Sequence, residues 1–200
     1  MGLDRRLHDA AHVGDVPAIR RLLREGLPLD ARDTDGRTPV MVATVARQAD
    51  AVRALIDAGA DIDIRDNRLD NVFLYAGANG LLEILELANE AGADPAITNR
   101  FGGTALIPAC ERGHVETVRY LLEQSDVDVD HVNRLGWTGL LEAIILSDGG
   151  PAHQEIVRLL LEAGADPDLA DGDGVTPLSH ARARGFDEIA ALLEAAGAGG

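Results

Sequence analysis

Two short motifs recur along the chain in step with one another. The first is a turn before a helix, centred on Thr or Asn at positions 38, 71, 104, 138 and 176, which are 33, 33, 34 and 38 residues apart. The second is a Gly after a Leu-rich segment, at positions 26, 59, 92, 164 and 197, with Ser125 in the one copy that lacks it. A shared period of this length indicates one small supersecondary unit, repeated and stacked on its neighbours.

Most copies of the repeat carry start or stop signals for short helices. Thr38 and Thr176 suit the N-cap position, and Pro39 and Pro177 suit the first helical position, where no hydrogen-bonded amide is lost. The closing Gly permits a left-handed C-cap. Asp- and Gly-rich runs such as residues 33–36 predict a hairpin turn between copies. The pattern therefore predicts pairs of short helices joined by hairpins.

These residues resemble the ankyrin repeat, whose signature is a Gly-x-Thr-Pro-Leu-His turn, two antiparallel helices and a Gly-Ala-Asp exit. The turn stands at residues 36–40 and 174–178, and the Ala-Gly-Ala-Asp exit at 58–61, 91–94 and 163–166. The resemblance covers residues 3–197 and is closest to small bacterial ankyrin proteins. It implies an all-α ankyrin-repeat solenoid of about six helix-turn-helix repeats with hairpin loops. Residues 1–200 are expected to form a single domain with repeats at 3–33, 34–66, 67–99, 100–133, 134–171 and 172–197.

Two departures from the repeat pattern carry structural expectations. Leu69 and Asp70 replace the turn Gly and its neighbour in the third copy, which predicts a distorted hairpin there. The fifth copy has extra residues around Ser147–His153, which we expect to form a loop between its two helices that serves recognition rather than stability.

Composition excludes several classes of function. The chain has 34 acidic and 18 basic residues, all of the latter Arg, so its net charge of −16 disfavours nucleic-acid binding. No apolar run approaches membrane-spanning length. The single Cys110 cannot form an internal disulfide and is expected to be a packed, inert thiol. We therefore expect a cytoplasmic protein that is monomeric and independent of membranes.

No motif for catalysis is present. The chain lacks a nucleophile elbow, a phosphate-binding Gly-rich loop and a His-Glu-x-x-His sequence. His8 and His12 lie four residues apart but have no third ligand in view. The sequence therefore predicts that the protein is not an enzyme and needs neither a metal nor a cofactor.

The resemblance leaves the hairpin tips and the exposed face of each first helix free for a partner. At these positions the fourth and fifth copies carry aromatic, apolar and Arg residues. Aromatic and Arg residues are enriched at binding hot spots. An acidic chain with this centre favours a partner protein with apolar and acidic spots of its own. The predicted partner-binding residues are Arg100, Phe101, Arg112, Arg134, Leu135 and Trp137.

A second interpretation is a small-molecule-binding protein or unusual enzyme that uses a concave groove. Its residues would be Tyr75, Glu111, Trp137 and Glu142. The open groove of a solenoid makes deep pockets hard to build, so protein binding is favoured. The sequence does not identify the partner, its pathway, or whether the segment 148–153 contacts it.

Overall fold

The computed structural model describes residues 4–199. Twelve helices and no strand occur in that range, which confirms the predicted all-α fold. The described residues divide into two compact units. The first runs to Ala76 and includes Leu81–Asp94, and the second comprises Gly77–Gly80 and the residues from Pro95 onward. That the chain behaves as a single domain stays a prediction.

The first unit is built from helix pairs stacked side by side. Helix α1 packs on α3, and α2 packs on α4, which also contacts α6. The interior is aliphatic, with Leu7, Ile19 and Leu55 almost fully buried. The helices are α1 (Arg6–Val13), α2 (Val16–Arg24), α3 (Pro39–Val45), α4 (Ala49–Asp57), α6 (Leu82–Glu90) and the first part of α5 (Val72–Ala78).

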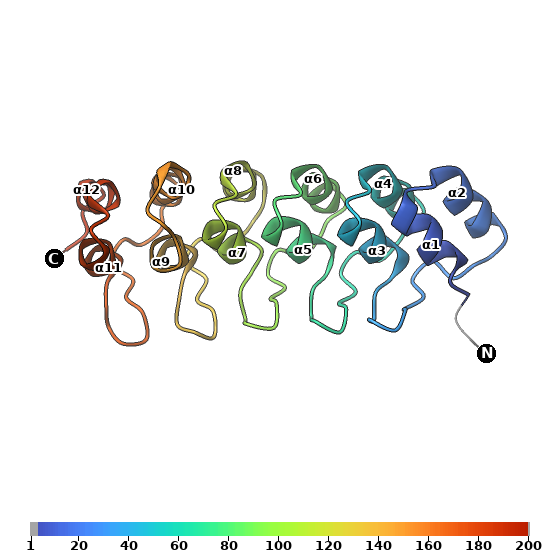
Figure 1. Ribbon diagram of the computed structural model, residues 1–200, viewed down its shortest axis with the longest axis horizontal. Coiled ribbons are helices and arrows are strands. Elements are labelled where there is room, and N and C mark those ends of the chain that lie inside the picture. Colours follow the sequence, from blue (N-terminus) through green and yellow to red (C-terminus); the bar gives the residue numbers. More distant parts are fainter. Residues whose placement is uncertain (1–3, 200) are drawn as a thin grey trace. The chain divides into compact units, whose positions relative to one another are not determined.

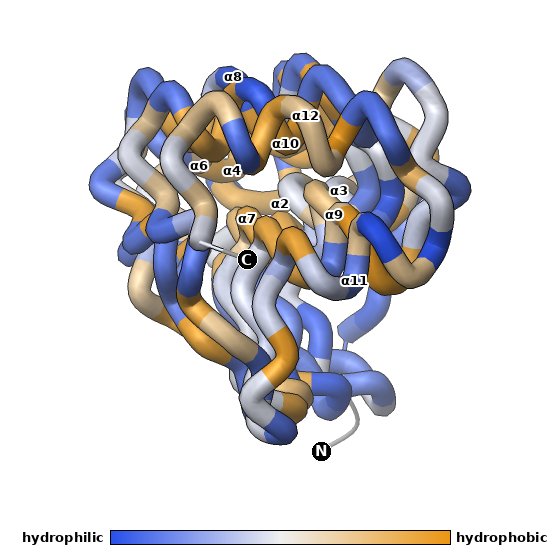
Figure 2. The backbone as a smooth tube through the Cα atoms, turned by 90° about the vertical axis from the view of Figure 1, so that its left-hand side faces the viewer, coloured by the Kyte–Doolittle hydropathy of each residue, from blue (hydrophilic) through white to orange (hydrophobic). Residues whose placement is uncertain are grey.

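The second unit has two helical layers, which Figure 1 shows between the yellow-green and red parts of the chain. One layer is α7 (Leu106–Glu111), α9 (Gly139–Ile145) and α11 (Pro177–Arg184), and the other is α8 (Val115–Gln124), α10 (Pro151–Glu162) and α12 (Asp187–Ala195). Leu121, Ile144 and Ile156 fill the space between the layers. Figure 2 shows orange hydrophobic stretches along these helices. Burial of this aliphatic surface is the main source of stability.

The helix starts follow the sequence prediction. The hydroxyls of Thr38 and Thr176 accept hydrogen bonds from amides three residues ahead, and Pro39 and Pro177 occupy the first helical position. Thr138 caps α9 in the same way. The Gly after each second helix adopts the left-handed conformation at positions 26, 59, 92, 164 and 197, as predicted.

Helix α7 departs from this pattern. Thr104 is buried, yet its hydroxyl has no hydrogen-bond partner, and the helix begins at Leu106, two residues later rather than one. In α3 and α9 the amide four residues after the Thr donates to the Thr carbonyl. Pro108 stands at that position in α7 and has no N–H to donate. Among the helices that follow a Thr, α7 therefore has the fewest hydrogen bonds in its first turn.

The five hairpins share one side-chain device. The first residue of each is Asp or Asn, and its Oδ1 accepts hydrogen bonds from the amides two and four residues ahead. Its own amide donates to the carbonyl four residues ahead at 2.8–3.0 Å. These turn-forming residues are Asp33, Asp66, Asn99, Asn133 and Asp171.

The prediction of a distorted hairpin at Leu69 is wrong. Asp66 makes the same three bonds as its counterparts in the other hairpins, and Leu69 adopts the left-handed conformation at φ 65°. The equivalent Gly36 has φ 75°. The turn is therefore preserved, and the strain is borne by the Leu69 backbone.

The extra segment of the fifth copy lies between its two helices, as predicted, but only part of it is a loop. Residues 151–153 form the first turn of α10. Gly149 lies so close to the Phe186 ring that a Cβ would be 2.5 Å from a ring carbon. His153 Nε2 lies 3.1 Å from the Glu111 carbonyl. The segment therefore contacts its neighbours at Gly149 and His153, whereas its small contribution to stability and its role in recognition stay predictions.

Candidate functional site

Two neighbouring hairpins of the second unit are joined at their tips. The Arg134 amide donates to the Phe101 carbonyl at 2.9 Å, and Arg134 Nη1 donates to the Arg100 carbonyl at 3.0 Å. The stem of Arg134 lies over Gly102, where a Cβ would be 2.9 Å from Arg134 Cγ. His131 Nε2 lies 2.7 Å from the Gly102 carbonyl and adds a further link. Hairpins 99–103 and 133–137 therefore form one continuous surface.

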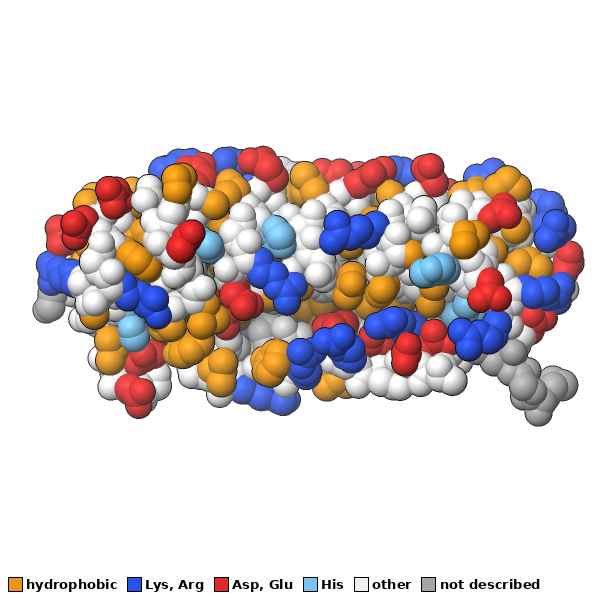
Figure 3. All heavy atoms as spheres, viewed as in Figure 1, with side chains coloured by type: hydrophobic (Ala, Val, Ile, Leu, Met, Phe, Trp, Pro, Cys, Tyr) orange, Lys and Arg blue, Asp and Glu red, His pale blue; other side chains and the backbone are white. Residues whose placement is uncertain are grey.

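This surface exposes large apolar side chains beside guanidinium groups. Phe101 is 51% exposed and Leu135 57% exposed. The Arg100 guanidinium carbon lies 4.4 Å from the centre of the Phe101 ring, a cation–π contact. Figure 3 shows orange and blue side chains next to each other along the lower edge, beneath α7 and α9. We call Arg100, Phe101, Arg134, Leu135 and Trp137 the tip surface.

Trp137 contributes to the tip surface and also closes its hairpin. Its amide donates to Asn133 Oδ1 at 3.1 Å, and its carbonyl accepts from the Asn133 amide at 3.0 Å. Its side chain is half-buried, unlike those of Phe101 and Leu135.

Arg112 lies apart from the other five predicted residues. It caps the C-terminus of α7, the end opposite the hairpin, and about 9 Å of helix separates the two ends. Its Nη1 donates to the Ala78 carbonyl and to Asn79 Oδ1. The structure thus brings five predicted residues together and places the sixth elsewhere.

Behind the tip surface lies a buried acid, Glu142 of α9. It is 5% exposed, and its Oε1 accepts a 2.7 Å hydrogen bond from Asn133 Nδ2. Burial, and then the nearby Glu111 charge, raise the pKa of Glu142 to about 7, against the opposing effect of the Asn133 hydrogen bond. Of the residues proposed for a groove, Glu111, Trp137 and Glu142 belong to the second unit and Tyr75 to the first.

Cys110 lies in the interior of the second unit. The Cys110 side chain is fully buried, and burial, reinforced by the Glu142 charge, raises the pKa of its thiol. Both effects disfavour the reactive thiolate.

Within residues 4–199, no three His, Cys, Asp or Glu side chains are grouped to hold a metal ion. No helix in the same range is long and apolar enough to cross a bilayer.

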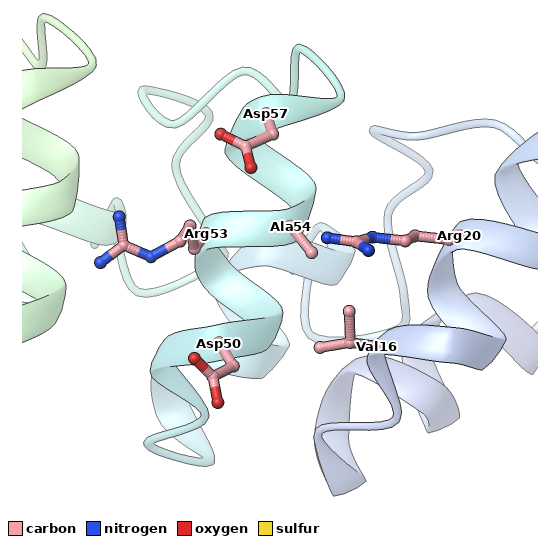
Figure 4. Close-up of a pocket in the computed structure, with 6 residues that line it drawn as sticks. All are labelled: Val16, Arg20, Asp50, Arg53, Ala54 and Asp57. Atoms are coloured by element: carbon pink, nitrogen blue, oxygen red, sulfur yellow. The ribbon is translucent and has the colours of Figure 1, made fainter.

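A shallow hollow of about 250 Å³ lies between α2 and α4 of the first unit. Figure 4 shows Arg20 reaching across it toward Ala54, whereas Arg53 points away from α2. All four charged side chains of its lining are exposed, and the remaining lining residues are Val16 and Ala54. The hollow lacks the buried polar group that fixes a small ligand.

Comparison with known proteins identifies the fold family. The family described as ankyrin repeats (3 copies) matches residues 5–66 and 73–171, well over half of the chain. The chain belongs to the ankyrin-repeat family. This ankyrin-repeat protein is 47% identical over 189 residues to the ankyrin repeat protein YahD of Escherichia coli K12, and the match covers 94% of both chains.

Two solved structures extend the similarity of this ankyrin-repeat protein. An ankyrin repeat domain from Acinetobacter baumannii is 55% identical, with a TM-score of 0.95 over 98% of this chain and 100% of that one. The ankyrin repeat domain of Bcl-3, a member of the IκB family, is 28% identical, with a TM-score of 0.88 over 98% of this chain and 87% of that one. Ankyrin repeats are in general protein–protein interaction modules.

Sequence reasoning placed Glu142 in an open groove and missed its connection to the tips. The signal was present at the residue four positions after each turn Thr or Asn, which is Val42, Tyr75, Pro108, Glu142 and His180. In the last two copies a titratable side chain at this position contacts the first hairpin residue at 2.7 Å, through Glu142–Asn133 and His180–Asp171. Comparing the residue at that position with the first residue of the hairpin in the same copy would have found both pairs.

Proposed function

We propose that this protein is a non-enzymatic binding module, acting as a scaffold, inhibitor or assembly factor, that recognises a partner protein through the tip surface. The observation that carries the proposal is the fixed pairing of hairpins 99–103 and 133–137, which presents Phe101 and Leu135 together. Preorganised apolar side chains bind with little loss of conformational entropy. Aromatic and Arg residues are also the side chains most enriched at binding hot spots.

The charges around the tip surface indicate the kind of partner. Neither Arg100 nor Arg134 takes part in any ion pair of the described chain, in which each salt bridge involves other residues. Their guanidinium groups therefore remain available to acidic side chains of a partner. The net charge of −16 repels other acidic surfaces, so only a partner with an apolar centre matched to Phe101 and Leu135 gains from binding.

The test combines Phe101→Ala with Leu135→Ala, because both side chains are exposed and take no part in the hydrogen bonds that hold the hairpins. A partner captured by the wild-type protein should bind the double variant at least 30-fold more weakly, which corresponds to about 2 kcal/mol or more. The melting temperature should stay within a few degrees of the wild type.

Leu146→Ala is the matched control, because Leu146 is an exposed leucine at the far end of α9. It should leave the affinity unchanged. Full binding by the double variant would move the site away from the tips, and the outer helices would be tested next. Equal losses in the double variant and in Leu146→Ala would mean that exposed apolar area in general, and not the tip surface, drives capture.

We further infer a monomer that works in the cytoplasm. A single, fully buried cysteine suits a reducing compartment, where no disulfide is needed. Sedimentation of the purified protein as a dimer would contradict the monomeric state.

A further inference from the structure

The turn between α5 and α6 carries the Asn-Gly sequence of the chain, Asn79-Gly80, directly after the last residue of α5. The backbone nitrogen of the residue after an asparagine can attack the side-chain amide carbon, and glycine hinders this attack least because it has no Cβ. The Gly80 nitrogen is bound only weakly, since its N–H donates to the Gly77 carbonyl at 3.3 Å, beyond the usual range of such bonds.

The fold itself requires the glycine that exposes Asn79 to this attack. Gly80 has a left-handed conformation at φ 65°, and an added Cβ would lie 2.8 Å from His114 Nδ1. Asn79 and Gly80 lie outside both helices, and Asn79 is only half-buried. Rotation about the Asn79 Cα–C bond, which brings the amide carbon toward the Gly80 nitrogen, therefore breaks turn bonds but no hydrogen bond within α5 or α6.

The other asparagines differ from Asn79 in the residue that follows them. Each precedes a larger residue, in the pairs Asn67-Arg68, Asn71-Val72, Asn89-Glu90, Asn99-Arg100 and Asn133-Arg134. Several are also held in place: Asn71 Oδ1 accepts from the Leu74 amide at 2.9 Å, and the Oδ1 atoms of Asn99 and Asn133 fix their hairpins. Attack on the amide carbon is therefore favoured at Asn79.

Arg112 lies where it would bind the product of this attack. Its Nη1 donates to Asn79 Oδ1 at 3.4 Å and to the Ala78 carbonyl, and all three residues belong to the second unit. None of the salt bridges found in residues 4–199 includes Arg112. An aspartate at position 79 keeps an oxygen at this place and adds a negative charge, so the guanidinium group binds it more tightly than the neutral amide.

We propose that Asn79 is a site of spontaneous deamidation and that the aspartate formed there pairs with Arg112. The Gly80 nitrogen forms a bond to Asn79 Cγ, the Cγ–Nδ2 bond breaks, and ammonia leaves with the proton of the Gly80 amide. Water then opens the resulting succinimide at either of its carbonyl carbons, which gives aspartate or isoaspartate. The reaction needs water and the atoms of the chain, and no other reactant.

The two products affect the turn differently. Aspartate leaves the main chain unchanged and gains the ion pair with Arg112. Isoaspartate places the Cβ of residue 79 in the main chain, which lengthens the turn and disrupts the bond from the Leu81 amide to the Ala76 carbonyl at 3.0 Å. The deamidated protein is therefore a mixture of a form with an added charge and a form with a loosened turn.

The modification is tested on the purified, folded protein, held at pH 8 and 37 °C for several weeks and digested at intervals for mass spectrometry. The peptide that contains Asn79 should change from amide to acid about tenfold faster than any other asparagine-containing peptide, because only Asn79 precedes glycine. Asn79→Gln should abolish the change, and Asn67→Gln is the matched control that should keep it. An unmodified Asn79, or a rate no higher than at the other asparagines, would overturn the proposal.

The pairing with Arg112 is tested separately, with Asn79→Asp in place of the slow reaction. At low salt this substitution should raise Tm by about 1–3 °C when Arg112 is present, as expected for an exposed ion pair. It should not raise Tm when Arg112 is replaced by Gln. Equal shifts in the two backgrounds would contradict the pairing. Both experiments need no partner, so they are independent of the function proposed above.

Discussion

The guanidinium group of Arg134 reaches back over Gly102 to the carbonyl oxygen of Arg100, and this bond joins two hairpins that are 34 positions apart in the chain. Arg134 thus has a positioning role as well as its charge. The side chain is exposed, so its contribution to global stability is small.

Arg134→Met separates positioning by the guanidinium from packing of the stem. Met keeps an unbranched stem over Gly102 but loses Nη1, so we expect an unchanged melting temperature and a partner affinity lower by about 1–2 kcal/mol. Calorimetric titration of the partner measures this loss. A melting temperature that drops by more than about 5 °C would show instead that the Arg100–Arg134 bond supports the fold.

Leu69→Gly should stabilise the protein by about 1 kcal/mol, because Gly adopts the left-handed conformation without the steric penalty that Leu bears at φ 65°. The midpoint of urea unfolding measures the change. Gly174→Ala is the reciprocal control: no heavy atom lies within 4 Å of the added Cβ, so backbone strain alone should destabilise it by a similar amount. A loss of stability in Leu69→Gly would indicate that the leucine side chain packs more than its 40% exposure suggests.

Thr104→Val and Thr138→Val should change stability in opposite directions although the two residues occupy equivalent positions. The buried hydroxyl of Thr104 has no partner, so its removal should stabilise by about 1 kcal/mol. The hydroxyl of Thr138 caps α9, so its removal should cost about 1 kcal/mol. Chemical denaturation of both variants under one condition provides the comparison, and equal signs would refute it.

Glu142 should make the stability of the protein depend on pH. Its folded-state pKa of about 7 exceeds the ordinary 4.5, so its contribution is fully present below about pH 4.5 and is lost as the pH rises through 7. Glu142→Gln should flatten this dependence and be more stable than the wild type at pH 8. We expect a difference of about 2 kcal/mol, since one pKa unit corresponds to about 1.4 kcal/mol and solvent screening reduces the total. Urea midpoints at pH 5.5 and pH 8 test this, and parallel curves for the two proteins would contradict it.

Local signals in the sequence were sufficient for the helices and most of the turns. Thr38-Pro39 and Thr176-Pro177 specify helix starts by their own chemistry, and the closing glycines specify the ends, so neither needs tertiary information. The hairpin at Leu69 was wrongly predicted to be distorted. The Asp66 side chain accepts two hydrogen bonds that hold the turn, and these outweigh the unfavourable backbone conformation of Leu69. The extra residues of the fifth copy were read as loop because their packing against Phe186 comes from the following repeat.

The candidate site was predictable only where position within the repeat decides the outcome. Arg100, Phe101, Arg134 and Leu135 occupy tip positions, and the tips of successive hairpins meet. Arg112 was grouped with these residues because the exposed face of the first helix, like the hairpin tips, is free for a partner. The length of α7 nevertheless separates Arg112 from the tips. The burial of Glu142 depends on stacking between α7 and α9, which no single repeat encodes.

The shared Asp or Asn at the start of each hairpin has a consequence for how such a protein diversifies. Because that one side chain and its three bonds fix the turn, the next two residues differ in every copy, from Thr34-Asp35 to Gly172-Asp173, and their remaining structural role is to link neighbouring hairpins, as Asn67 and Arg134 do. We expect mutations at the positions that make no such link to change the proposed recognition surface while the turn stays intact. Specificity can therefore drift, or be redesigned, a dipeptide at a time on an unchanged framework.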